Sequence, residues 1–600
     1  SGSTFKSLEG QKTRFSMALE GQSLIKPSAA HVDAEAPMSL GLKQKTAYGA
    51  LEAHQAQGRG AAHVGIPSVC WYILIVELCE RLAFYTITGS QSFFLEHIGF
   101  TLSNAGALNA TMWTLCTVLA VVASWTADVG LGRYYTILAS GLLYVTGAAV
   151  AALAAIPGKE NANWYFFAVM GLLPLATAGI KANISNFGAD QYDESDPAQV
   201  AAQEQFFSVF YCSINLGAAL AYGFFTTFAS SGGLGVPKTW GYPVAYGAMA
   251  VCMMVAVGVY RAGRRSYKVH PLLERSALAS LIGCLTNSAV EGGSRKAASV
   301  VVGILLLLSS IMLSAAQSLV PALGTKMMYF AFVCALVGTL AVVLPCLNPE
   351  WLHYGGLAIT SEQKDVRDFL ALMPVLFTGS IAFNALYNCM QFWYAQQACQ
   401  MDVRLPFGTG TFQLSGSFFN IADCLAIVVV TPMAVLWIDP SLSRLLKGRF
   451  SHSQKFTMGM AIAALSVFVA ARLELMRKAV PVLSETSNCA PPGVGMSDMQ
   501  GAWMMLPFFL MGVAEIYTQP TLLHYAYSKS PASMRTLAMA ASFFIAAVSS
   551  ALFALLVSAL GPYMPNDLNH GHLEYGYYIN LALGGIFLVP FLSVMRDDGH

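Results

Sequence analysis

Three ionisable side chains, Glu77, Glu80 and Arg81, lie inside one apolar stretch that runs from Trp71 to Leu95. A charge within a membrane-spanning helix is costly, so such residues face a cavity or pair with one another and mark a path for ions or substrate. Because residues three and four positions apart share a helical face, one stripe would carry both carboxylates and the guanidinium. We therefore expect this stripe to face protein or water and not lipid.

The composition of the whole chain is that of a polytopic membrane protein. Of its 600 residues, 56% are hydrophobic and only 11% are charged, a balance far more apolar than in soluble domains. About 20 apolar residues cross the hydrocarbon core. The predicted spans are 69–95, 104–127, 133–156, 163–187, 204–229 and 241–262, then 297–321 and 326–346, then 368–398, 412–438, 455–476, 500–527, 535–560 and 575–595. The predicted fold class is an all-α polytopic membrane protein with a six, two, six arrangement of spans.

Lysine and arginine are unevenly shared between the two sets of loops, and this bias decides orientation. Basic residues gather before the first span, after the second and sixth, and between the eighth and ninth of the twelve main spans, whereas the connections 96–103, 157–162 and 561–574 hold only Lys159. This pattern predicts that both termini are cytosolic. Arg477 and Lys478 are the exceptions. The net charge of +1 gives no indication of a nucleic-acid partner.

The predicted domains are a cytosolic tail (1–66), a six-helix bundle (67–263), a linker (264–367) and a second six-helix bundle (368–600). Within the linker, Leu and Ile recur at helical spacing around 272–285, which predicts either a short helix on the cytosolic membrane face or a packing helix that clamps the two halves. In the tail, the segments 20–25 and 48–51 match endolysosomal sorting patterns, although loose patterns of this kind also arise by chance. The sequence therefore leaves two locations possible for the protein, the plasma membrane and an endolysosomal membrane.

The twelve cysteines are scattered mainly through apolar spans, with no CxxC pair. This distribution predicts neither a disulfide framework nor a metal site, and Cys489 stands alone in a long loop. The sequence also contains no nucleophile elbow, phosphate-binding glycine loop or HExxH motif. We therefore expect no enzyme activity and no cofactor other than protons as the coupling ion.

A series of motifs resembles one family in the correct order. The segment Glu77–Tyr85 resembles the ExxERxxYY motif of the proton-coupled oligopeptide transporter family, whose plant branch also carries nitrate and hormones. The further similar segments are Asp128–Tyr134 (the loop between spans two and three of the major facilitator superfamily), Gly179–Gln191, Phe206–Gly217, Gly512–Glu515, Pro531–Arg535 and Asn569–Tyr575. The likeness extends from about Glu77 to Val594.

This resemblance implies a major facilitator fold with two six-helix bundles, which works by alternating access around a site near the membrane midplane. In bacterial members two extra helices join the halves, and the runs within 297–346 fit that description. The sequence alone also allows a long re-entrant hairpin there.

Lys181 is alone in an apolar span, where a buried ammonium either loses its proton or finds a carboxylate. We expect Glu77 or Glu80 to be that partner. Protonation of one glutamate would weaken its hold on Lys181 or Arg81 and would free a cation for a substrate carboxylate. The predicted proton-coupling group is therefore Glu77, Glu80, Arg81 and Lys181, and the alternative is a purely structural charge network.

Glu515 is the only acid between Met504 and Tyr525 and suits a substrate ammonium. The resemblance implies that it receives a peptide N-terminus while Lys181 receives the C-terminus. Asn215 matches a position that helps to bind the amino end, or it makes an interhelical hydrogen bond, and Tyr85 either contacts substrate or belongs to the core. Asp128 and Arg133 resemble the family's inter-helix gate, and the alternative is a tight loop around Gly132.

The departures from the family pattern concern cargo. Thr88 stands where bacterial peptide carriers have an arginine, Asn388 where they have an acid, and Asp423 where they have an asparagine. Asp423 is either a replacement acid or a polar interhelical contact. The nitrate-binding histidine of the plant branch falls at Tyr387, which disfavours nitrate. His524, often a glutamate in that branch, is expected to be a solvated or capping residue.

We expect a proton-coupled symporter of di- and tripeptides. Its expected partners are a small zwitterionic substrate, protons and the lipid bilayer in which the protein lies. Transport of histidine, other amino acids, nitrate or another small organic anion is the nearest alternative, followed by a channel or a signalling scaffold with a transporter fold. The predicted substrate site comprises Tyr85, Lys181, Asn215, Tyr387, Asn388, Asp423 and Glu515.

Overall fold

A computed structural model of the chain describes residues 66–193, 196–272, 276–320, 324–352, 360–405, 412–445 and 450–595. These residues belong to one compact unit, Met38–His600. The predicted sorting patterns at 20–25 and 48–51 lie outside the described residues.

The N-terminal half, defined here by the described residues of 66–272, contains the first six predicted spans as helices. They are α2 (Ser68–His97), α3 (Leu102–Trp125) with η2 (Thr126–Gly130), α4 (Arg133–Ala154), α5 (Ala162–Phe166) with η3 (Phe167–Leu172) and α6 (Leu173–Ala189), α7 (Pro197–Leu220) with η4 (Ala221–Phe225) and α8 (Thr226–Ser231), and α9 (Gly241–Ala262).

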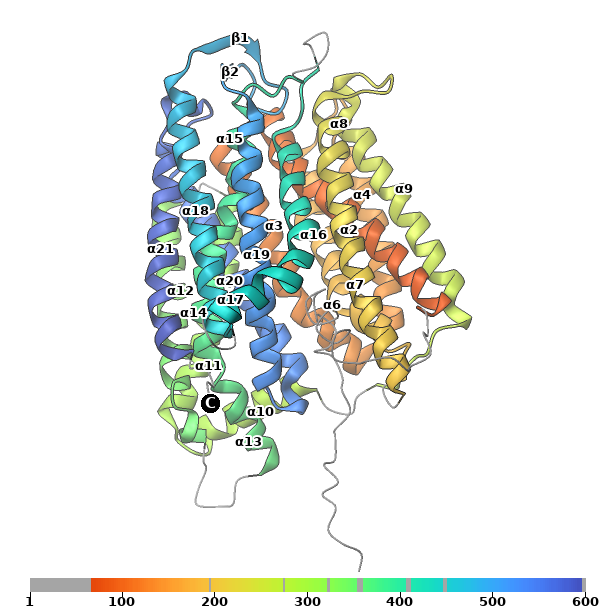
Figure 1. The fold of residues 1–600 in the computed structure, drawn as a ribbon, viewed down its shortest axis with the longest axis vertical. Coiled ribbons are helices and arrows are strands. Elements are labelled where there is room, and N and C mark those ends of the chain that lie inside the picture. The colour runs from red at the N-terminus through yellow and green to blue at the C-terminus, as the bar shows by residue number, and fades with distance from the viewer. Residues whose placement is uncertain are drawn as a thin grey trace, which may run out of the picture. The chain divides into compact units, whose positions relative to one another are not determined.

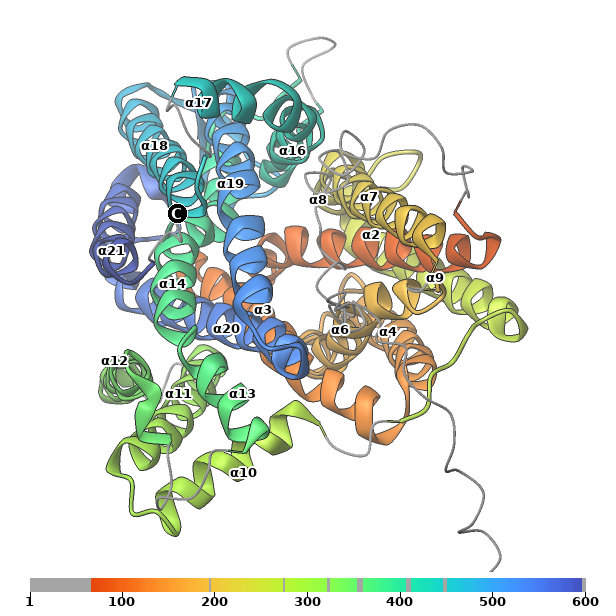
Figure 2. The same cartoon turned by 60° about the horizontal axis from the view of Figure 1, so that its bottom comes forward.

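The C-terminal half, residues 360–595 where described, contains the last six. They are α13 (Ser361–Leu370) with α14 (Met373–Cys389), η9 (Met390–Tyr394) and α15 (Ala395–Cys399); η10 (Gly416–Asn420) with α16 (Ile421–Met433), η11 (Ala434–Ile438) and α17 (Asp439–Leu445); α18 (His452–Ala479); η12 (Gly501–Met504) with α19 (Met505–Lys529); α20 (Arg535–Ala559); and α21 (Leu573–Val594). Figure 2 shows α2, α4, α6, α7 and α9 gathered apart from α14, α16, α18, α19 and α21. Helices α3 and α20 pack against each other where the two halves meet.

Among the described residues, thirteen helices are long and apolar enough to cross a membrane. Helix α2 is not one of them, because its 30 residues include Glu77, Glu80 and Arg81. With α2 added, every predicted span corresponds to a helix. The fold class predicted from the sequence is therefore confirmed.

The linker contributes three helices, α10 (Ala277–Val290), α11 (Arg295–Leu319) and α12 (Gly324–Cys346). Helices α11 and α12 pack closely, because a Cβ on Gly303 would lie only 2.9 Å from the Gly338 carbonyl oxygen; glycines allow such an approach. With 25 and 23 residues, each is longer than the roughly 20 residues that a span needs. Both extra helices are therefore long enough to cross a membrane, which favours two spans over a re-entrant hairpin.

The predicted linker helix exists as α10 and packs against α11 and α13. Leu281 and Leu285 are buried in this contact, whereas Ile282 is exposed. The burial shows that α10 packs on helices of the linker and the C-terminal half, and both the clamp between the halves and a seat on the membrane surface stay predictions.

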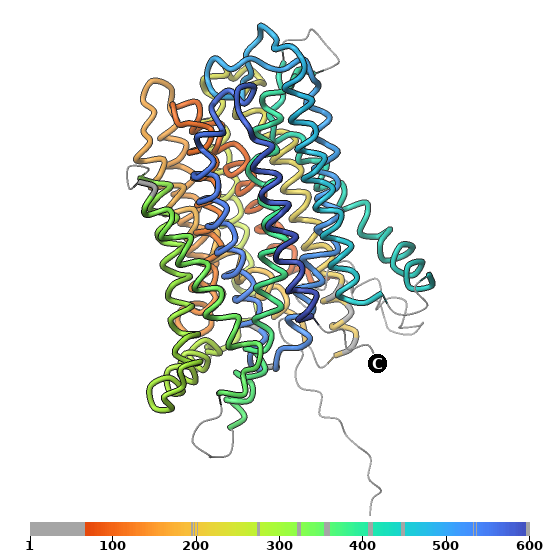
Figure 3. Tube along the Cα trace, turned by 90° about the vertical axis from the view of Figure 1, so that its left-hand side faces the viewer, coloured from red at the N-terminus to blue at the C-terminus, as the bar shows by residue number. Residues whose placement is uncertain are grey.

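The only sheet among the described residues is an antiparallel pair, β1 (Val482–Thr486) with β2 (Gly495–Ser497), in which Val482 lies opposite Ser497. The pair lies at the end of the unit where α15 ends and α19 begins, and α10 and α13 lie at the opposite end (Figures 1 and 3). We call these the hairpin end and the linker end. By hydrogen bonding, the start of α3 at Leu102 also belongs to the hairpin end.

Cys399 and Cys489 form a disulfide at the hairpin end, with a Cα–Cα distance of 5.4 Å. The prediction that no disulfide forms was wrong. The two cysteines lie 90 residues apart in sequence, and α18 must return the chain to the same end before they meet. Spacing alone carries no signal for such a pair.

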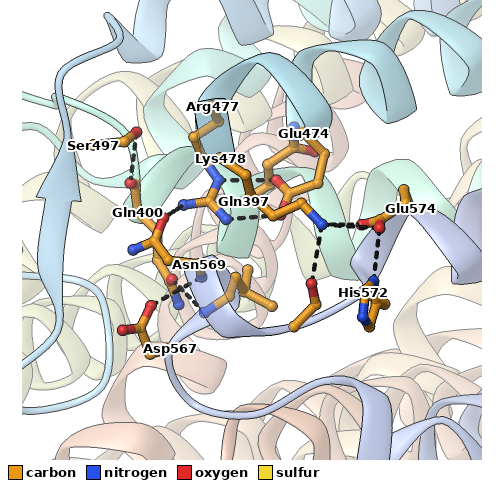
Figure 4. Close-up of polar contacts among 12 residues, drawn as sticks. Gln397, Gln400, Glu474, Arg477, Lys478, Ser497, Asp567, Asn569, His572 and Glu574 are labelled. Atoms are coloured by element: carbon orange, nitrogen blue, oxygen red, sulfur yellow. Dashed lines mark hydrogen bonds and ion pairs between the residues drawn. The ribbon is translucent and has the colours of Figure 1, made fainter. Parts of the chain in front are cut away.

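Arg477 and Lys478, the two exceptions to the charge bias, lie at the end of α18 and are neutralised there (Figure 4). The Arg477 guanidinium is fully buried, donates to both Glu474 oxygens at 2.9 and 2.7 Å, and reaches Asn569 Oδ1 at 2.7 Å. The Lys478 ammonium lies 2.8 Å from both Glu574 oxygens. These two charges therefore belong to internal ion pairs and are not free surface charge.

We predict that Glu474→Ala lowers the free energy of unfolding by about 3–5 kcal/mol, because it leaves the Arg477 charge buried without a carboxylate. Thermal unfolding of the purified protein in detergent measures this change. Glu485→Ala is the matched control, since the Glu485 side chain is 53% exposed and its contact with Arg404 is long, 3.5 Å. Equal midpoint shifts for the two variants would contradict the account.

Candidate functional site

A buried ion group forms on α2. Glu77, Glu80 and Arg81 are 3%, 0% and 4% exposed. The Arg81 Nε lies 3.1 Å from Glu77 Oε1, and its Nη2 contacts Glu80 Oε2. Gly217 of α7 lets the helices approach, since a Cβ there would lie 2.8 Å from Arg81 Cβ. The charged stripe therefore faces protein, as the sequence predicts.

Lys181 on α6 is not paired as predicted. Among the described residues it makes no ion pair, whereas Arg81 pairs with both Glu77 and Glu80. The Lys181 Nζ instead lies 6.0 Å from the ring centre of Trp113 on α3 and 5.5 Å from that of Phe543 on α20. Arg81 takes the direct contacts with both carboxylates, so the Lys181 ammonium interacts with Glu77 and Glu80 only at longer range and lies against the faces of aromatic rings. This leaves an ammonium at the junction of the halves with no carboxylate on it.

Two acids meet on the other half. Asp423 of α16 is buried and packs on the backbone of α19, where a Cβ on Gly512 would lie 2.8 Å from Asp423 Oδ1. Gly512 lies one helical turn before Glu515, and the two carboxylates are close enough to interact electrostatically. Asp423 Oδ1 and Glu515 Oε2 are buried and accept no hydrogen bond from the described residues. The sequence predicted both acids separately but not their proximity.

Tyrosines surround this acidic pair. The Tyr387 hydroxyl of α14 lies within reach of Glu515, and the Tyr85 ring lies 5.4 Å from that of Tyr222. Tyr211 faces both acids. Sequence reasoning missed Tyr222 and gave Tyr211 no role, although positions 211, 215 and 222 fall on one helical face and so carried the signal.

The two predicted asparagines make helix contacts. Asn215 Nδ2 donates to the Tyr211 carbonyl of its own helix at 3.0 Å. Asn388 Nδ2 reaches the Ser549 carbonyl of α20 at 3.5 Å. Asn215 thus lies next to Tyr211, one of the tyrosines around the acidic pair. Asn388 links α14 to α20.

A small cavity of about 20 Å³ lies between the halves, enough for roughly one water molecule. Its lining includes Thr88, Asn109, Trp113, Tyr222, Gln391 and Asn420. Thr88, the departure from the bacterial arginine, donates to the Phe84 carbonyl at 2.8 Å. At this position a satisfied hydroxyl replaces a charge.

Hydrogen bonds between the halves close the hairpin end. Gln396 Nε2 of α15 donates to Glu96 Oε1 at 2.9 Å and to the Leu102 carbonyl at 3.2 Å. Ser103 Oγ donates to the Val557 carbonyl at 2.9 Å. The other such bonds, each written from donor to acceptor, are Leu102 to Asn566, Ser417 to Gly89, Ser231 to Gln413, Ser415 to Thr227, Lys238 to Asn488 and Asn488 to Ser231. We call this set the hairpin-end seal; it comprises the hydrogen bonds found between described residues of opposite halves.

Glu96 was missed at the level of sequence. It lies one residue beyond the apolar stretch that ends at Leu95, so the sequence places it in the predicted loop 96–103. The structure includes it in the last turn of α2, 1% exposed.

The predicted gate pair exists but lies within one half. Arg133 Nη2 lies 3.4 Å from Asp128 Oδ1, and Arg133 Nη1 also binds Asp190 Oδ2. These contacts join the ends of α3, α4 and α6 at Gly132, where φ is +80°. His524 is exposed and contacts His452, with 3.0 Å between ring nitrogens.

The chain is similar to known transporters over most of its length. The sequence model "PTR2: POT family" matches residues 134–563. Protein NRT1/PTR FAMILY 8.1 of Arabidopsis thaliana is 25% identical over 560 residues, which cover 88% of this chain and 93% of that protein. Protein NRT1/PTR FAMILY 5.14 of the same plant is 22% identical, with 91% and 95% covered.

Solved structures show the same fold. An auto-inhibited POT family peptide transporter matches with a TM-score of 0.67 at 20% identity, covering 89% of this chain and 99% of that one. The POT family transporter PepTSo also gives 0.67, at 22% identity with 88% and 97% covered. A POT family transporter in complex with 5-aminolevulinic acid gives 0.62, at 17% identity with 88% and 97% covered.

The family model alone covers more than two thirds of the chain, including parts of both halves, and the relatives match 88% and 91% of it. The chain therefore belongs to the POT family of membrane transporters.

Proposed function

We propose that this chain is a proton-coupled symporter of di- and tripeptides that works by alternating access. The observation that carries the proposal is the distribution of charge across the junction of the halves. Lys181, on the N-terminal side, has no carboxylate partner among the described residues, while Asp423 and Glu515 gather on the C-terminal side without a cation. A zwitterion with a carboxylate at one end and an ammonium at the other matches this polarity.

Coupling follows from the ion group on α2. Arg81 divides its charge between Glu77 and Glu80. A proton on Glu80 removes one of these attractions, so Arg81 gains freedom to share a substrate carboxylate with Lys181. By linkage, the substrate carboxylate then favours protonation of Glu80 to the same extent. Proton and substrate thereby stabilise each other on the N-terminal half.

The acids on the C-terminal half disfavour a simple anion such as nitrate, because two carboxylates would repel it. A relative in the family was solved with 5-aminolevulinic acid, a small molecule that carries an amine and a carboxylate. Histidine or another amino acid offers the same two groups and is the second candidate. A scaffold role has no observation of its own in its favour.

The proposal includes an orientation. Helix α4 begins at Arg133, and α9 ends near Arg261, Arg264 and Arg265, from where the chain continues to α10 at the linker end. Lys and Arg are biased towards the cytosol, which assigns the linker end and both termini to that side. The hairpin end then faces the outside or the lumen of an endolysosomal compartment.

We predict that labelled dipeptide accumulates in proteoliposomes only with an inwardly directed proton gradient, and that Lys181→Ala removes this accumulation. The reason is that Lys181 supplies the cation for the substrate carboxylate. Free histidine and nitrate, tested in parallel, separate the alternative cargos.

The matched control is Lys159→Ala, which removes an exposed lysine from a loop and leaves uptake unchanged. Gradient-driven movement of nitrate or histidine alone would overturn the peptide assignment and keep the fold. Unaltered dipeptide uptake by Lys181→Ala would refute the role of that side chain.

We also predict that Glu515→Gln weakens dipeptide binding by about 10- to 100-fold, because a charge-assisted hydrogen bond to the ammonium contributes about 1.5–3 kcal/mol. An N-acetylated dipeptide, which has no ammonium, should bind the wild type and Glu515→Gln with similar weak affinity. Competition against labelled dipeptide measures both constants. If the variant weakened both ligands equally, Glu515 would have a structural role and not an ammonium-binding one.

A further inference from the structure

Glu96 makes a carboxylate contact between the halves that the coupling mechanism does not use. Its side chain is 1% exposed and its partner Gln396 is 2% exposed. The Gln396 Nε2 donates to Glu96 Oε1 at 2.9 Å. The hydrogen bonds between other described residues of the two halves use hydroxyl, amide, ammonium and backbone groups, so Glu96 supplies the one carboxylate of the hairpin-end seal.

The surroundings of Glu96 hold no countercharge. Among the described residues, the Glu96 carboxylate makes no ion pair, and the group that donates to it is the neutral Gln396 amide. The titratable groups beside it are the buried Tyr242 hydroxyl of α9 and His97, the exposed next residue on α2, whose ring centre lies 6.1 Å from that of Tyr242. An ionised carboxylate that is removed from water and left with one neutral donor is costly, whereas a neutral carboxyl group is much less so.

The partner amide is also suited to a neutral Glu96. Gln396 Oε1 is buried and accepts no hydrogen bond from the described residues. A protonated Glu96 would carry the O–H donor that this oxygen lacks, while still accepting from Nε2. The acid and the amide would then each donate and accept, which satisfies more of the buried polar atoms.

We propose that Glu96 is a second proton-binding site, separate from the group on α2 that includes Glu80, and that its protonation closes the hairpin-end seal. The proposal rests on the alternating access of the proposed function, since the seal must open for substrate to enter from that end. When the halves part there, Glu96 meets water and ionises at low cost; when they close, the neutral form is buried. The proton enters and leaves from the same side, so it sets the closing equilibrium and not the number of protons that cross per substrate.

The test measures closure directly. Spin labels attached to non-natural residues at Lys159 and Tyr563, two exposed positions near the hairpin end on opposite halves, report the distance between the halves by pulsed electron resonance in nanodiscs. Non-natural residues avoid labelling the native cysteines. In the wild type, acidification should raise the ratio of closed to open molecules. Because one proton is bound per closure, the rise should approach roughly tenfold for each unit by which the pH falls.

Glu96→Gln keeps the shape and supplies both hydrogen bonds without ionising, so it should stay closed at every pH tested. Gln396→Leu, which removes the partner, should lower the closed fraction in acid. His97→Gln is the matched control and should titrate like the wild type. A Glu96→Gln protein with the pH response of the wild type would overturn the proposal, as would a His97→Gln protein without that response.

This readout needs no substrate, so it separates the two proposals. A pH response that depends on Glu96 in a protein that fails to accumulate peptide would keep the seal site and refute the cargo. Normal proton-driven peptide uptake together with a pH response independent of Glu96 would do the reverse. The ratio of protons to peptide transported should be the same for Glu96→Gln and the wild type, and a lower ratio in the variant would also refute the proposal, because Glu96 would then carry a transported proton.

Discussion

The ion pairs of Arg81 with Glu77 and Glu80 constrain the rest of the structure, because three charges on one helix cannot face lipid. Helix α2 must be enclosed, and α3, α7 and α9 pack around it. Gly217 allows α7 to lie close against α2, since a Cβ at this position would lie 2.8 Å from Arg81 Cβ. Once α2 is enclosed, its other positions follow, with Tyr85 at the junction of the halves and Glu96 at the hairpin end. The charged motif therefore fixes the position of α2 in the fold as well as its chemistry.

The two halves present charged groups of opposite sign at their junction, and a substrate could bind to both. The N-terminal half presents the Lys181 ammonium, which no carboxylate of the described residues contacts directly, and the C-terminal half presents the acids Asp423 and Glu515. Neither side satisfies the other directly, since the Lys181 ammonium lies against Trp113 and Phe543. A substrate with two opposite charges would complete both, and its binding would draw the halves together.

Most of the fold could be predicted from the sequence, because long apolar runs and their number dictate the helices, and the motif order indicates the family. The site was predicted less completely. Glu515 and Asp423 were identified as lone acids, but their contact depends on the tight packing at Gly512, which no spacing rule reveals. The pairing of Lys181 failed because Arg81, one residue from Glu80, competes for the same carboxylates. The Cys399–Cys489 bond and the Glu96–Gln396 contact join residues that are distant in sequence, so they become visible only when the helices are assembled.

The central claim is that the ion group on α2 moves protons together with substrate, and proton entry tests it most directly. A pH-sensitive dye trapped in proteoliposomes would report acidification of the lumen when dipeptide is added outside, with no imposed pH gradient and a negative interior. The account predicts acidification with the wild type, none without dipeptide, and none with Glu80→Gln, which cannot release a proton. Dipeptide entry without acidification in the wild type, or acidification retained in Glu80→Gln, would contradict it.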